Sequence, residues 1–304
     1  TPVFPLAHQE AGNGWAEVGI TKDAGDDPDV THGALIIARV TASDGGVVFK
    51  AGEGVGTVTK AGLPIAVGEP AINPVPRAMI SGVIEEQAKR YGQKPDICVT
   101  VGVPHGAKIA LKTWNPRLGI KGGLSILGTT GIVRPFSCAA WIASIHRGID
   151  VAVAGGQAHV AGCTGSTSEK VVQDLFNLPD HAMLDMGDFA GGMLKYLAKH
   201  PVPRVTIGGG IGKITKLAQG AVDLHSSRTQ VDFDALNTLS LSLGLADVRD
   251  ANTALEAVTR AGNGLAQAIA EQARICVLNK VKNTIQHVDI VVIDRSGNIL
   301  GQAE

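Results

Sequence analysis

The sequence predicts two domains of mixed class: a strand-rich α+β domain over residues 1–147, followed by a Rossmann-like α/β domain with a mainly parallel sheet over residues 148–304. Short β-type runs separated by glycines dominate the first half. In the second half a strand, a glycine-rich or acidic turn, and a helix follow one another three times, which is typical of a parallel α/β sheet. The length of 304 residues also exceeds what a single hydrophobic core usually serves, about 250–300 residues.

Local patterns in the first half predict strands, one long helix and a hairpin. Apolar and polar residues alternate over residues 15–21, as in a half-buried strand. Further β-type runs cover residues 35–40, 47–50 and 55–59. Asn73 and Pro74 are expected to begin a helix as its N-cap and first-turn residues. The runs 97–103 and 108–112 would then pair as a hairpin.

The second half is expected to consist of strands that each end in a distinctive turn. The three strands cover residues 149–154, 182–184 and 204–207, and they end at Gly155-Gly156, at the acidic turn 185–188 and at Gly208–Gly210 respectively. Ser166 and Glu169 match a capping box at the start of the first helix. Helices are expected over residues 171–176, 189–199, 211–217 and 265–278, before a last strand at 288–293 and a hairpin turn at 296–298.

Composition argues against several classes of protein. A formal net charge of −1 disfavours a nucleic-acid partner, which usually requires a basic face. No apolar run reaches the ~18–20 residues that a membrane span needs, and residues 1–10 lack the pattern of a signal peptide. The four cysteines are scattered without a Cys-x-x-Cys pair, so we expect reduced thiols and a cytoplasmic protein.

The densest polar cluster directly follows the strand at residues 15–21. It contains a lysine, four carboxylates and a histidine within eleven residues: Lys22, Asp23, Asp26, Asp27, Asp29 and His32. Like charges this close repel one another, so a purely structural loop gains little from them. A divalent-metal site, a general acid or base, hydrogen bonding to a polar substrate, and a solvated acidic turn are all compatible with this composition. The positions of its glycine and its acids do not fit an EF-hand.

Two kinds of glycine-rich turn could meet a ligand. The turn Gly128-Thr129-Thr130-Gly131 offers N–H groups and hydroxyls to an anion or a ribose, although an ordinary loop can have the same composition. In the second half, ligands should bind beyond the carboxyl ends of the parallel strands. A nucleoside-type site is therefore expected at Gly155, Gly156, Asp185, Gly187, Asp188, Gly208, Gly209 and Gly210, with Asp185 or Asp188 on the ribose. The run 208–213 does not fit a Walker A phosphate loop, because isoleucines stand at two of its required positions.

Together these motifs resemble the CbiD family of cobalamin biosynthesis. The matching runs are KDAGDDPDVTHG at 22–33, GEGVGTVT at 52–59, GEPAINPVPR at 68–77 and NPRLGIKGGLSILGTTG at 115–131, with weaker agreement at 185–189 and 209–216. The resemblance extends over nearly the whole chain. Members of this family usually open with a segment resembling Arg-x-Gly-x-Thr-Thr-Gly-Thr-Cys-Ala-Ala-Ala, whereas this chain begins at Thr1, close to the first strand. If that segment contributes to the active site, we expect the chain from Thr1 onward to be incomplete as a catalyst.

The resemblance implies an S-adenosylmethionine-dependent methyltransferase that acts at C1 of cobalt-precorrin-5B and gives cobalt-precorrin-6A. Cobalt would arrive within the substrate, so no metal ligands of the protein are implied. The acidic loop would position Lys22 or His32, and a carboxylate such as Asp26 could take up a ring proton. Basic side chains would bind the carboxylate arms of the substrate; the candidates are Arg77, Lys112, Arg117, Lys121 and Arg134. The implied partner is this small tetrapyrrole, without nucleic acid or membrane, and a homo-oligomer is compatible with the sequence.

Two other functions stay open at this point. A nucleotide-dependent phosphotransferase would use the acidic loop for magnesium and Lys213 for phosphate, and magnesium-dependent ATP hydrolysis would support it. A non-catalytic tetrapyrrole carrier would bind the precorrin without any affinity for S-adenosylmethionine. One calorimetric titration with S-adenosylhomocysteine separates such a carrier from a methyltransferase.

Overall fold

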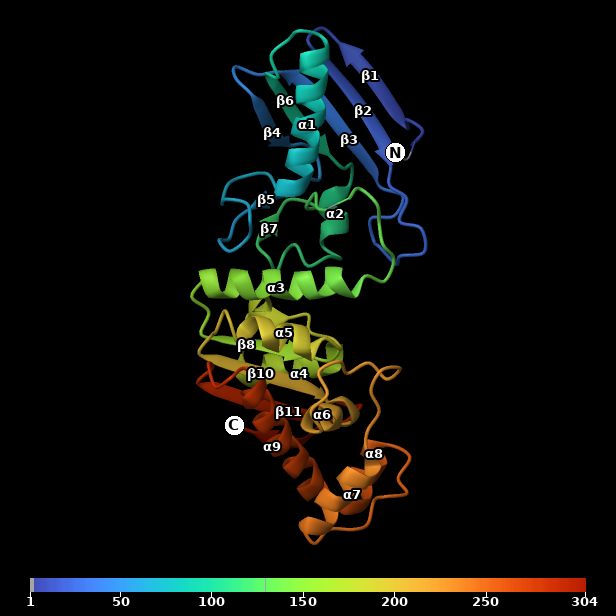
Figure 1. Ribbon diagram of the computed structural model, residues 1–304, viewed down its shortest axis with the longest axis vertical. Helices are drawn as coiled ribbons and strands as arrows, with labels where there is room; N and C mark the ends of the chain where they lie inside the picture. The colour runs from blue at the N-terminus through green and yellow to red at the C-terminus, as the bar shows by residue number, and fades with distance from the viewer. Residues whose placement is uncertain (1–2, 129) are drawn as a thin grey trace. The chain divides into compact units, whose positions relative to one another are not determined.

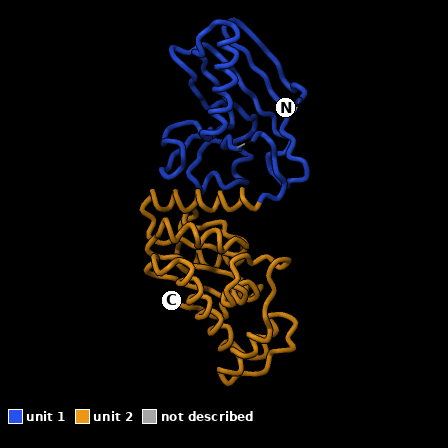
Figure 2. Tube along the Cα trace, in the orientation of Figure 1, with its two compact units in different colours: residues 1–137 blue, residues 138–304 orange. Residues whose placement is uncertain are grey.

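The computed structural model describes residues 3–128 and 130–304, and the chain divides into two compact units (Figure 2). Unit 1 spans residues 1–137 and unit 2 spans residues 138–304, and each combines helices with β-sheet. The fold is therefore of mixed α/β class, as expected. The boundary that we expected after residue 147 falls inside helix α3, Cys138–Ala154, so the second unit begins earlier than the sequence pattern indicated.

Unit 1 is built on a mixed sheet with strands in the order β1-β2-β3-β6-β4 (Figure 1). The strands are β1 His8–Gly12, β2 Trp15–Thr21, β3 Leu35–Ala42, β4 Val47–Ala51 and β6 Ile97–Gly102. Neighbouring strands are antiparallel except β4, which runs parallel to β6. The predicted strands at 15–21, 35–40, 47–50 and 97–103 are confirmed, whereas β1 had no counterpart in the prediction.

Helix α1, Pro74–Arg90, covers one face of this sheet (Figure 1). A proline occupies its first turn and Asn73 stands at the N-cap with extended backbone, although the Asn73 side chain makes no capping hydrogen bond. Ile80 and Ile84 pack against a cluster of buried residues that includes Val99 of β6. The start of α1 is thus confirmed, and the apolar positions of the helix hold it on the sheet.

The remaining part of unit 1 contains the short strands β5 Thr57–Val58 and β7 Ile120–Lys121, which pair antiparallel, and the short helix α2 Gly106–Ala110. The hairpin expected between 97–103 and 108–112 is wrong. Strand β6 already pairs with β3 on one side and β4 on the other, so it has no free edge for another strand. The chain turns instead at His105, whose backbone is left-handed with φ of 62°, and enters α2.

Three glycines of unit 1 allow three chain segments to cross in close contact. A Cβ atom added to Gly106 would lie 2.3 Å from the carbonyl oxygen of Gly54, and one added to Gly123 would lie 2.2 Å from that same oxygen. The N–H of Leu124 donates to this oxygen at 2.8 Å. Gly54 of the run 52–59 and its two partners, Gly106 and Gly123, therefore serve backbone packing, because a side chain at any of the three would displace the crossing segments.

Unit 2 is built on a sheet in the order β12-β11-β10-β8-β9, of which β8, β10 and β11 are labelled in Figure 1. The strands are β8 His159–Cys163, β9 Met183–Leu184, β10 Arg204–Gly210, β11 His287–Ile293 and β12 Ile299–Ala303. Four of them are parallel, and β12 closes the sheet as an antiparallel neighbour of β11. The mainly parallel sheet and the strands at 182–184, 204–207 and 288–293 are confirmed, as is the hairpin turn after β11.

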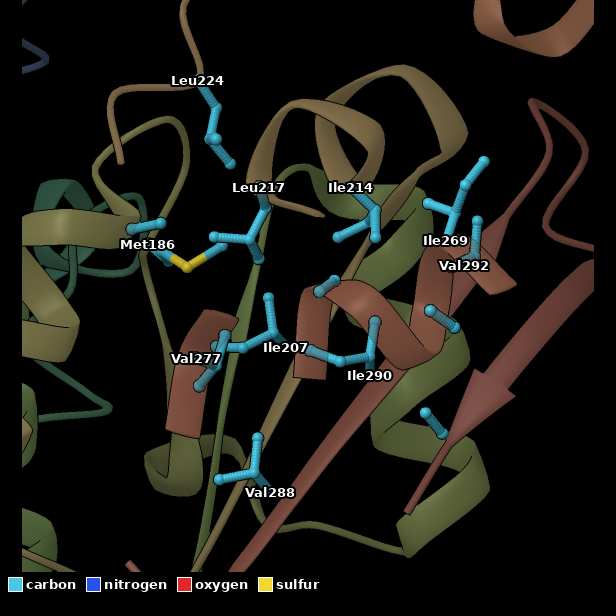
Figure 3. Packing of buried hydrophobic residues seen from close by; sticks show 14 of the residues in the cluster. Met186, Ile207, Ile214, Leu217, Leu224, Ile269, Val277, Val288, Ile290 and Val292 are labelled. Atoms are coloured by element: carbon cyan, nitrogen blue, oxygen red, sulfur yellow. The ribbon is translucent and has the colours of Figure 1, made fainter. Parts of the chain in front are cut away.

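Helices cover both faces of this sheet. They are α3, α4 Ser166–Phe176, α5 Ala190–Leu197, α6 Ile211–Ala218, α7 Phe233–Ser242, α8 Ala254–Ala261 and α9 Asn263–Lys280, with the short 3₁₀ helix η1 Asp180–Ala182 before β9. The main core joins Ile207 and Ile290 of the sheet to Ile214, Leu217 and Ile269 of the helices (Figure 3). A second cluster on the other face includes Val172 of α4.

No helix among the described residues has the length and apolar character that crossing a membrane requires.

The strand expected at 149–154 is wrong, because these residues form the end of α3. Ile145, Ile149 and Ala152 are buried at helical spacing, and a short apolar run cannot by itself distinguish a buried strand from a buried helix. The first strand of the sheet is β8 instead. The capping box is also wrong: Gly165 is the N-cap of α4, and Ser166 is already helical.

Candidate functional site

We call the region beyond the carboxyl ends of β8 and β10 in unit 2 the crevice, because open α/β sheets with this kind of strand order bind their ligands at that position. Numbered along the chain, the strands lie in the order 2-1-3-4-5, so β8 and β10 are neighbours and the chain leaves them in different directions. The helix after β8 packs in one core cluster, and the helix after β10 packs in the other. Ligands of such doubly wound sheets bind beyond the carboxyl ends of the two strands at this point. Thr164 and Gly165 follow β8 directly, and Gly208–Gly210 are the last residues of β10, so these five residues lie there.

Glycines bring the ends of β8 and β10 into contact. The N–H of Thr164 donates to the carbonyl of Gly208 at 2.9 Å, and a Cβ added to Gly209 would lie 2.8 Å from Thr164 Oγ1. At Gly165 and Gly210, in contrast, an added Cβ would meet no atom within 4 Å. The glycines between the two strand ends are thus tightly packed, whereas Gly165 and Gly210 have free space on the side where a Cβ atom would stand.

The acidic turn after β9 lies at the same edge. Lys213 Nζ lies 2.8 Å from Asp188 Oδ1 and donates to the carbonyl of Thr164 at 3.1 Å. The N–H of Gly187 donates to the carbonyl of Cys163 at 3.0 Å, which ties the turn to the end of β8. Asp188 therefore has Lys213 as a counter-ion. Lys213 is likewise engaged, which weakens the phosphotransferase alternative.

Trp141 of α3 is a site residue that the sequence did not single out. Its indole Nε1 donates to the carbonyl of Asp185 at 2.8 Å, and a Cβ added to Gly187 would lie 3.3 Å from the indole ring. The side chain is nonetheless 45% exposed. An exposed aromatic ring beside an acidic turn offers a flat surface on which a nucleobase can stack. In the sequence, the only signal for Trp141 was that it is one of few aromatic residues in this chain.

Gly155 and Gly156 do not belong to this crevice. They follow α3 and precede β8, so they lie at the amino end of that strand, opposite to Gly208–Gly210. The error comes from the misplaced strand at 149–154. Thr164 and Gly165, which directly follow the real strand β8, occupy the position that we had assigned to these glycines.

In unit 1, the acidic loop is held together largely by its own residues. Lys22 Nζ forms an ion pair with Asp29 Oδ2 and donates to Thr31 Oγ1 at 2.5 Å. Asp29 Oδ1 accepts from the N–H of Thr31 at 2.8 Å and from its hydroxyl at 2.6 Å. Burial raises the pKa of Asp29, but these bonds to Lys22 and Thr31 outweigh burial and hold the pKa below its ordinary value. Lys22 and Asp29 therefore shape the loop.

The other carboxylates of the loop differ in their partners. Asp23 Oδ1 accepts from the N–H of Gly25 at 2.9 Å, and Asp27 Oδ1 accepts from the N–H of Phe136 at 2.9 Å. His32 Nδ1 accepts from the N–H of Ala24 at 3.1 Å, so this nitrogen carries no proton in that bond. Asp26 is exposed, and no hydrogen bond or ion pair engages its carboxylate within the described chain. Asp26 is therefore the carboxylate of this loop that the described residues leave unengaged.

The bond between Asp27 and Phe136 connects the acidic loop to the segment that follows the glycine-rich turn 128–131. Gly128, Thr130 and Gly131 of this turn and the exposed Arg134 after it are described, whereas Thr129 lies outside the described residues. The Thr130 hydroxyl accepts from the N–H of Ile132 at 3.3 Å within its own turn. The structure thus joins two segments more than a hundred positions apart in the sequence, at the same side of unit 1.

The basic side chains that we assigned to substrate carboxylates differ in availability. Arg77 donates to the carbonyls of Ile72 and Pro70 at 2.8 and 3.1 Å and pairs with Glu69, so it serves the fold of unit 1. The Arg117 guanidinium lies 4.3 Å from the ring of Trp114. Lys112, Lys121 and Arg134 are exposed. Arg77 is accordingly a poor candidate for substrate binding.

Lys60 is a further basic residue of this region that sequence reasoning missed. The aliphatic part of its side chain packs against Gly119, where an added Cβ would lie 2.4 Å from Lys60 Cγ. Burial, and then the neighbouring charge of Lys121, lower the pKa of Lys60. No carboxylate forms an ion pair with Lys60 or Lys121 among the described residues. Two adjacent cations without an anion would favour a ligand that carries carboxylates.

A group of potential metal ligands lies on the hairpin β1–β2. The ligand atoms of His8, Glu10 and Glu17 all lie within 4.8 Å of one another, and Glu10 stands opposite Glu17 in the register. His8 Nε2 already lies within hydrogen-bond distance of Glu17 Oε1, at 2.8 Å. The group is therefore a cross-strand polar pair with one further exposed carboxylate.

Comparisons with known proteins identify the same family in both units of the chain. The family model described as CbiD matches residues 1–135, and the model described as CbiD, C-terminal domain, matches residues 223–304. A Paramagnetospirillum magneticum protein named cobalt-precorrin-5B C(1)-methyltransferase is 57% identical over 311 residues, which cover 100% of this chain and 87% of that relative. A protein of the same name from Brucella anthropi is 58% identical, with 99% and 84% covered. A crystal structure described as a cobalamin biosynthesis protein (cbiD) from Archaeoglobus fulgidus is 26% identical, covers 72% of this chain and 68% of that one, and has a TM-score of 0.34.

Proposed function

This chain belongs to the CbiD family, and we propose that it transfers a methyl group from S-adenosylmethionine to C1 of cobalt-precorrin-5B, which gives cobalt-precorrin-6A. The observation that carries this proposal is the 57% identity, over the full length of the chain, to a relative named for this reaction. Methyl transfer breaks the bond between sulfur and the methyl carbon as the ring carbon attacks. The enzyme must hold both reactants in line, which is chiefly a task of orientation.

The methyl donor is assigned to the crevice of unit 2, which we regard as a Rossmann-like domain. Two features support this assignment: open space above Gly165 and Gly210, and the strand order that places them at the switch in strand direction. Trp141 would stack on the adenine ring, and the Asp185 carboxylate would accept hydrogen bonds from the ribose hydroxyls. The adjacent pair of Lys213 and Asp188 would hold the turn in place.

The tetrapyrrole is assigned to unit 1. Its carboxylate arms would be bound by basic side chains of this unit, for which the candidates are Lys60, Lys112, Arg117, Lys121 and Arg134. The Asp26 carboxylate would take up the proton that leaves the ring. The neighbouring ion pair of Lys22 and Asp29 would fix the backbone on which Asp26 is presented. Cobalt enters and leaves as part of this substrate.

The activity is tested by incubating the chain with cobalt-precorrin-5B and S-adenosylmethionine that carries a ¹³C-labelled methyl group. We expect the label to appear at C1 of the product, as measured by NMR, together with S-adenosylhomocysteine. An unmethylated tetrapyrrole that stays bound to a chain without affinity for S-adenosylhomocysteine would instead support a carrier.

The donor site is tested by calorimetric titration with S-adenosylhomocysteine. Asp185→Asn should weaken binding by ~10–100-fold, which corresponds to a lost charge-assisted hydrogen bond of ~1.5–3 kcal/mol. Asp234→Asn is the matched control, because Asp234 is an exposed carboxylate of α7 outside the crevice. Unchanged affinity in Asp185→Asn would move the donor elsewhere, and the first alternative is the turn Gly128–Gly131.

A further inference from the structure

Unit 2 contains a second hollow besides the crevice. A cavity of about 400 Å³ lies between α6, α7 and α9 and the segment 219–232, and none of the crevice residues lines it. This volume is within the range of small-molecule sites, roughly 300–1,000 Å³. Nothing in the proposed methyl transfer uses this cavity.

Lys216 lines the cavity and is itself buried. The residue is only 7% exposed, and its ammonium donates to the carbonyl of Leu224 at 3.0 Å. Within the described chain no carboxylate forms an ion pair with it. An ammonium has three donors, and burying it is costly without a counter-ion. Asp289 is even more buried, at 1% exposed, but it is paired with Arg204, whereas Lys216 has a hydrogen-bond acceptor and no counter-ion among the described residues.

The other walls of the cavity combine apolar side chains, one carboxylate and several uncharged polar side chains, Thr215, Gln219, Thr229, Gln230 and Gln272. Leu236, Leu239 and Ile269 form an apolar side. Asp232 is exposed and lines the cavity as well; one of its oxygens, Oδ1, caps α7 by accepting from Ala235 N–H at 2.9 Å. The second oxygen of this carboxylate has no hydrogen bond among the described residues. A cation, an apolar side and an exposed anion thus border the same space.

From these walls we infer that the cavity binds an α-amino acid with an apolar side chain. The amino-acid carboxylate pairs with the buried ammonium of Lys216, its side chain packs against Leu236, Leu239 and Ile269, and its ammonium group lies toward Asp232. A purely apolar ligand would leave Lys216 uncompensated. A phosphate or another dianion would face repulsion from Asp232 and would leave the apolar side empty. The inference is independent of the proposed methyl transfer, because it concerns other residues and its test measures binding alone.

The first test uses the unaltered protein and three probes in calorimetric titrations. L-leucine should bind. The matched amine without a carboxylate, 3-methylbutylamine, should bind at least ~10-fold more weakly, because it cannot pair with a buried cation. The matched acid without an ammonium, 4-methylpentanoate, should bind only ~2–5-fold more weakly, because Asp232 is exposed and its ion pair is screened by solvent. If L-leucine does not bind at millimolar concentration, or if 3-methylbutylamine binds equally well, the inference is overturned.

The second test removes the buried charge. Lys216→Met removes the charge and keeps an unbranched side chain that is one atom shorter, and it should lower the affinity for L-leucine at least ~10-fold, to the level of 3-methylbutylamine. Lys280→Met, at an exposed lysine of α9, is the matched control and should leave the affinity unchanged. Circular dichroism establishes that each variant is folded. Equal affinity of Lys216→Met and the unaltered protein would exclude Lys216 as the counter-ion.

Discussion

Replacing Asp289 with alanine should lower the free energy of unfolding by about 3 kcal/mol. Asp289 is a buried carboxylate of β11, 1% exposed, and it accepts two hydrogen bonds from Arg204 at 2.7 and 2.9 Å. It also accepts from the hydroxyl of Thr206 at 2.8 Å, and that hydroxyl in turn contacts His159 Nε2 at 2.8 Å. One carboxylate therefore satisfies polar groups on the neighbouring strand β10.

The magnitude follows from what the substitution leaves behind. Removing one partner of a buried ion pair usually costs ~3–5 kcal/mol, because the other charge stays buried without compensation. The Arg204 side chain is 34% exposed, so its guanidinium can regain water, and the lower end of this range applies. Thr206 is fully buried and loses its acceptor, but it keeps the contact with His159.

Urea denaturation followed by circular dichroism measures this loss. Asp250→Ala is the matched control, because Asp250 pairs with Arg260 in an exposed ion pair that should contribute no more than ~1 kcal/mol. The affinity for S-adenosylhomocysteine should stay the same in Asp289→Ala, since Arg204 stands at the amino end of β10 and the crevice at its carboxyl end. If Asp289→Ala is no more destabilising than Asp250→Ala, the buried network contributes little and the reasoning fails.

Three further predictions follow from the site and from the same network. Asp26→Asn should reduce turnover ~10²–10⁴-fold and leave the urea midpoint of unfolding unchanged. The control is Asp44→Asn, at an exposed residue of unit 1, which should leave turnover intact. Equal turnover in the two variants would exclude Asp26 as the base. Lys60→Met should raise KM for the tetrapyrrole and make it less sensitive to salt, with kcat preserved, and a loss confined to kcat would contradict a role in binding. Burial, and then the charge of Arg204, lower the pKa of His159 in the folded protein, so the unfolded chain binds a proton near pH 6.5 that the folded chain does not. The free energy of unfolding should accordingly be highest above pH ~7 and fall as the pH is lowered toward 5. His159→Asn should make this pH dependence weaker. If the variant shows the same pH dependence as the unaltered protein, other groups cause it.

Local patterns predicted much of the fold. The alternation over residues 15–21 is set by one buried and one exposed face, so it identified β2 without knowledge of its neighbours. The turns at 185–188 and 208–210 were placed at one edge correctly, because parallel strands joined by helices must end on the same side. Their roles in binding stay predictions.

The failures concern features that depend on distant parts of the chain. Residues 149–154 are apolar because α3 packs on a sheet, and a short apolar run is the same in a buried helix and in a buried strand. Trp141 became a site candidate only because its indole reaches the carbonyl of Asp185. Lys60 was missed for the same reason, since its environment is made by Gly119 and Lys121, which come much later in the sequence.

The crossing of Gly54, Gly106 and Gly123 has a consequence for the order in which unit 1 folds. The three backbone segments meet within van der Waals distance although they are far apart along the chain, so closing this contact requires large loops to be ordered at once. Non-local contacts of this kind slow folding. We therefore expect strands β5 and β7 and helix α2 to form late and as one cooperative unit. The amide protons of Gly56 and Leu124, whose hydrogen bonds flank the crossing, should exchange with solvent at the same rate.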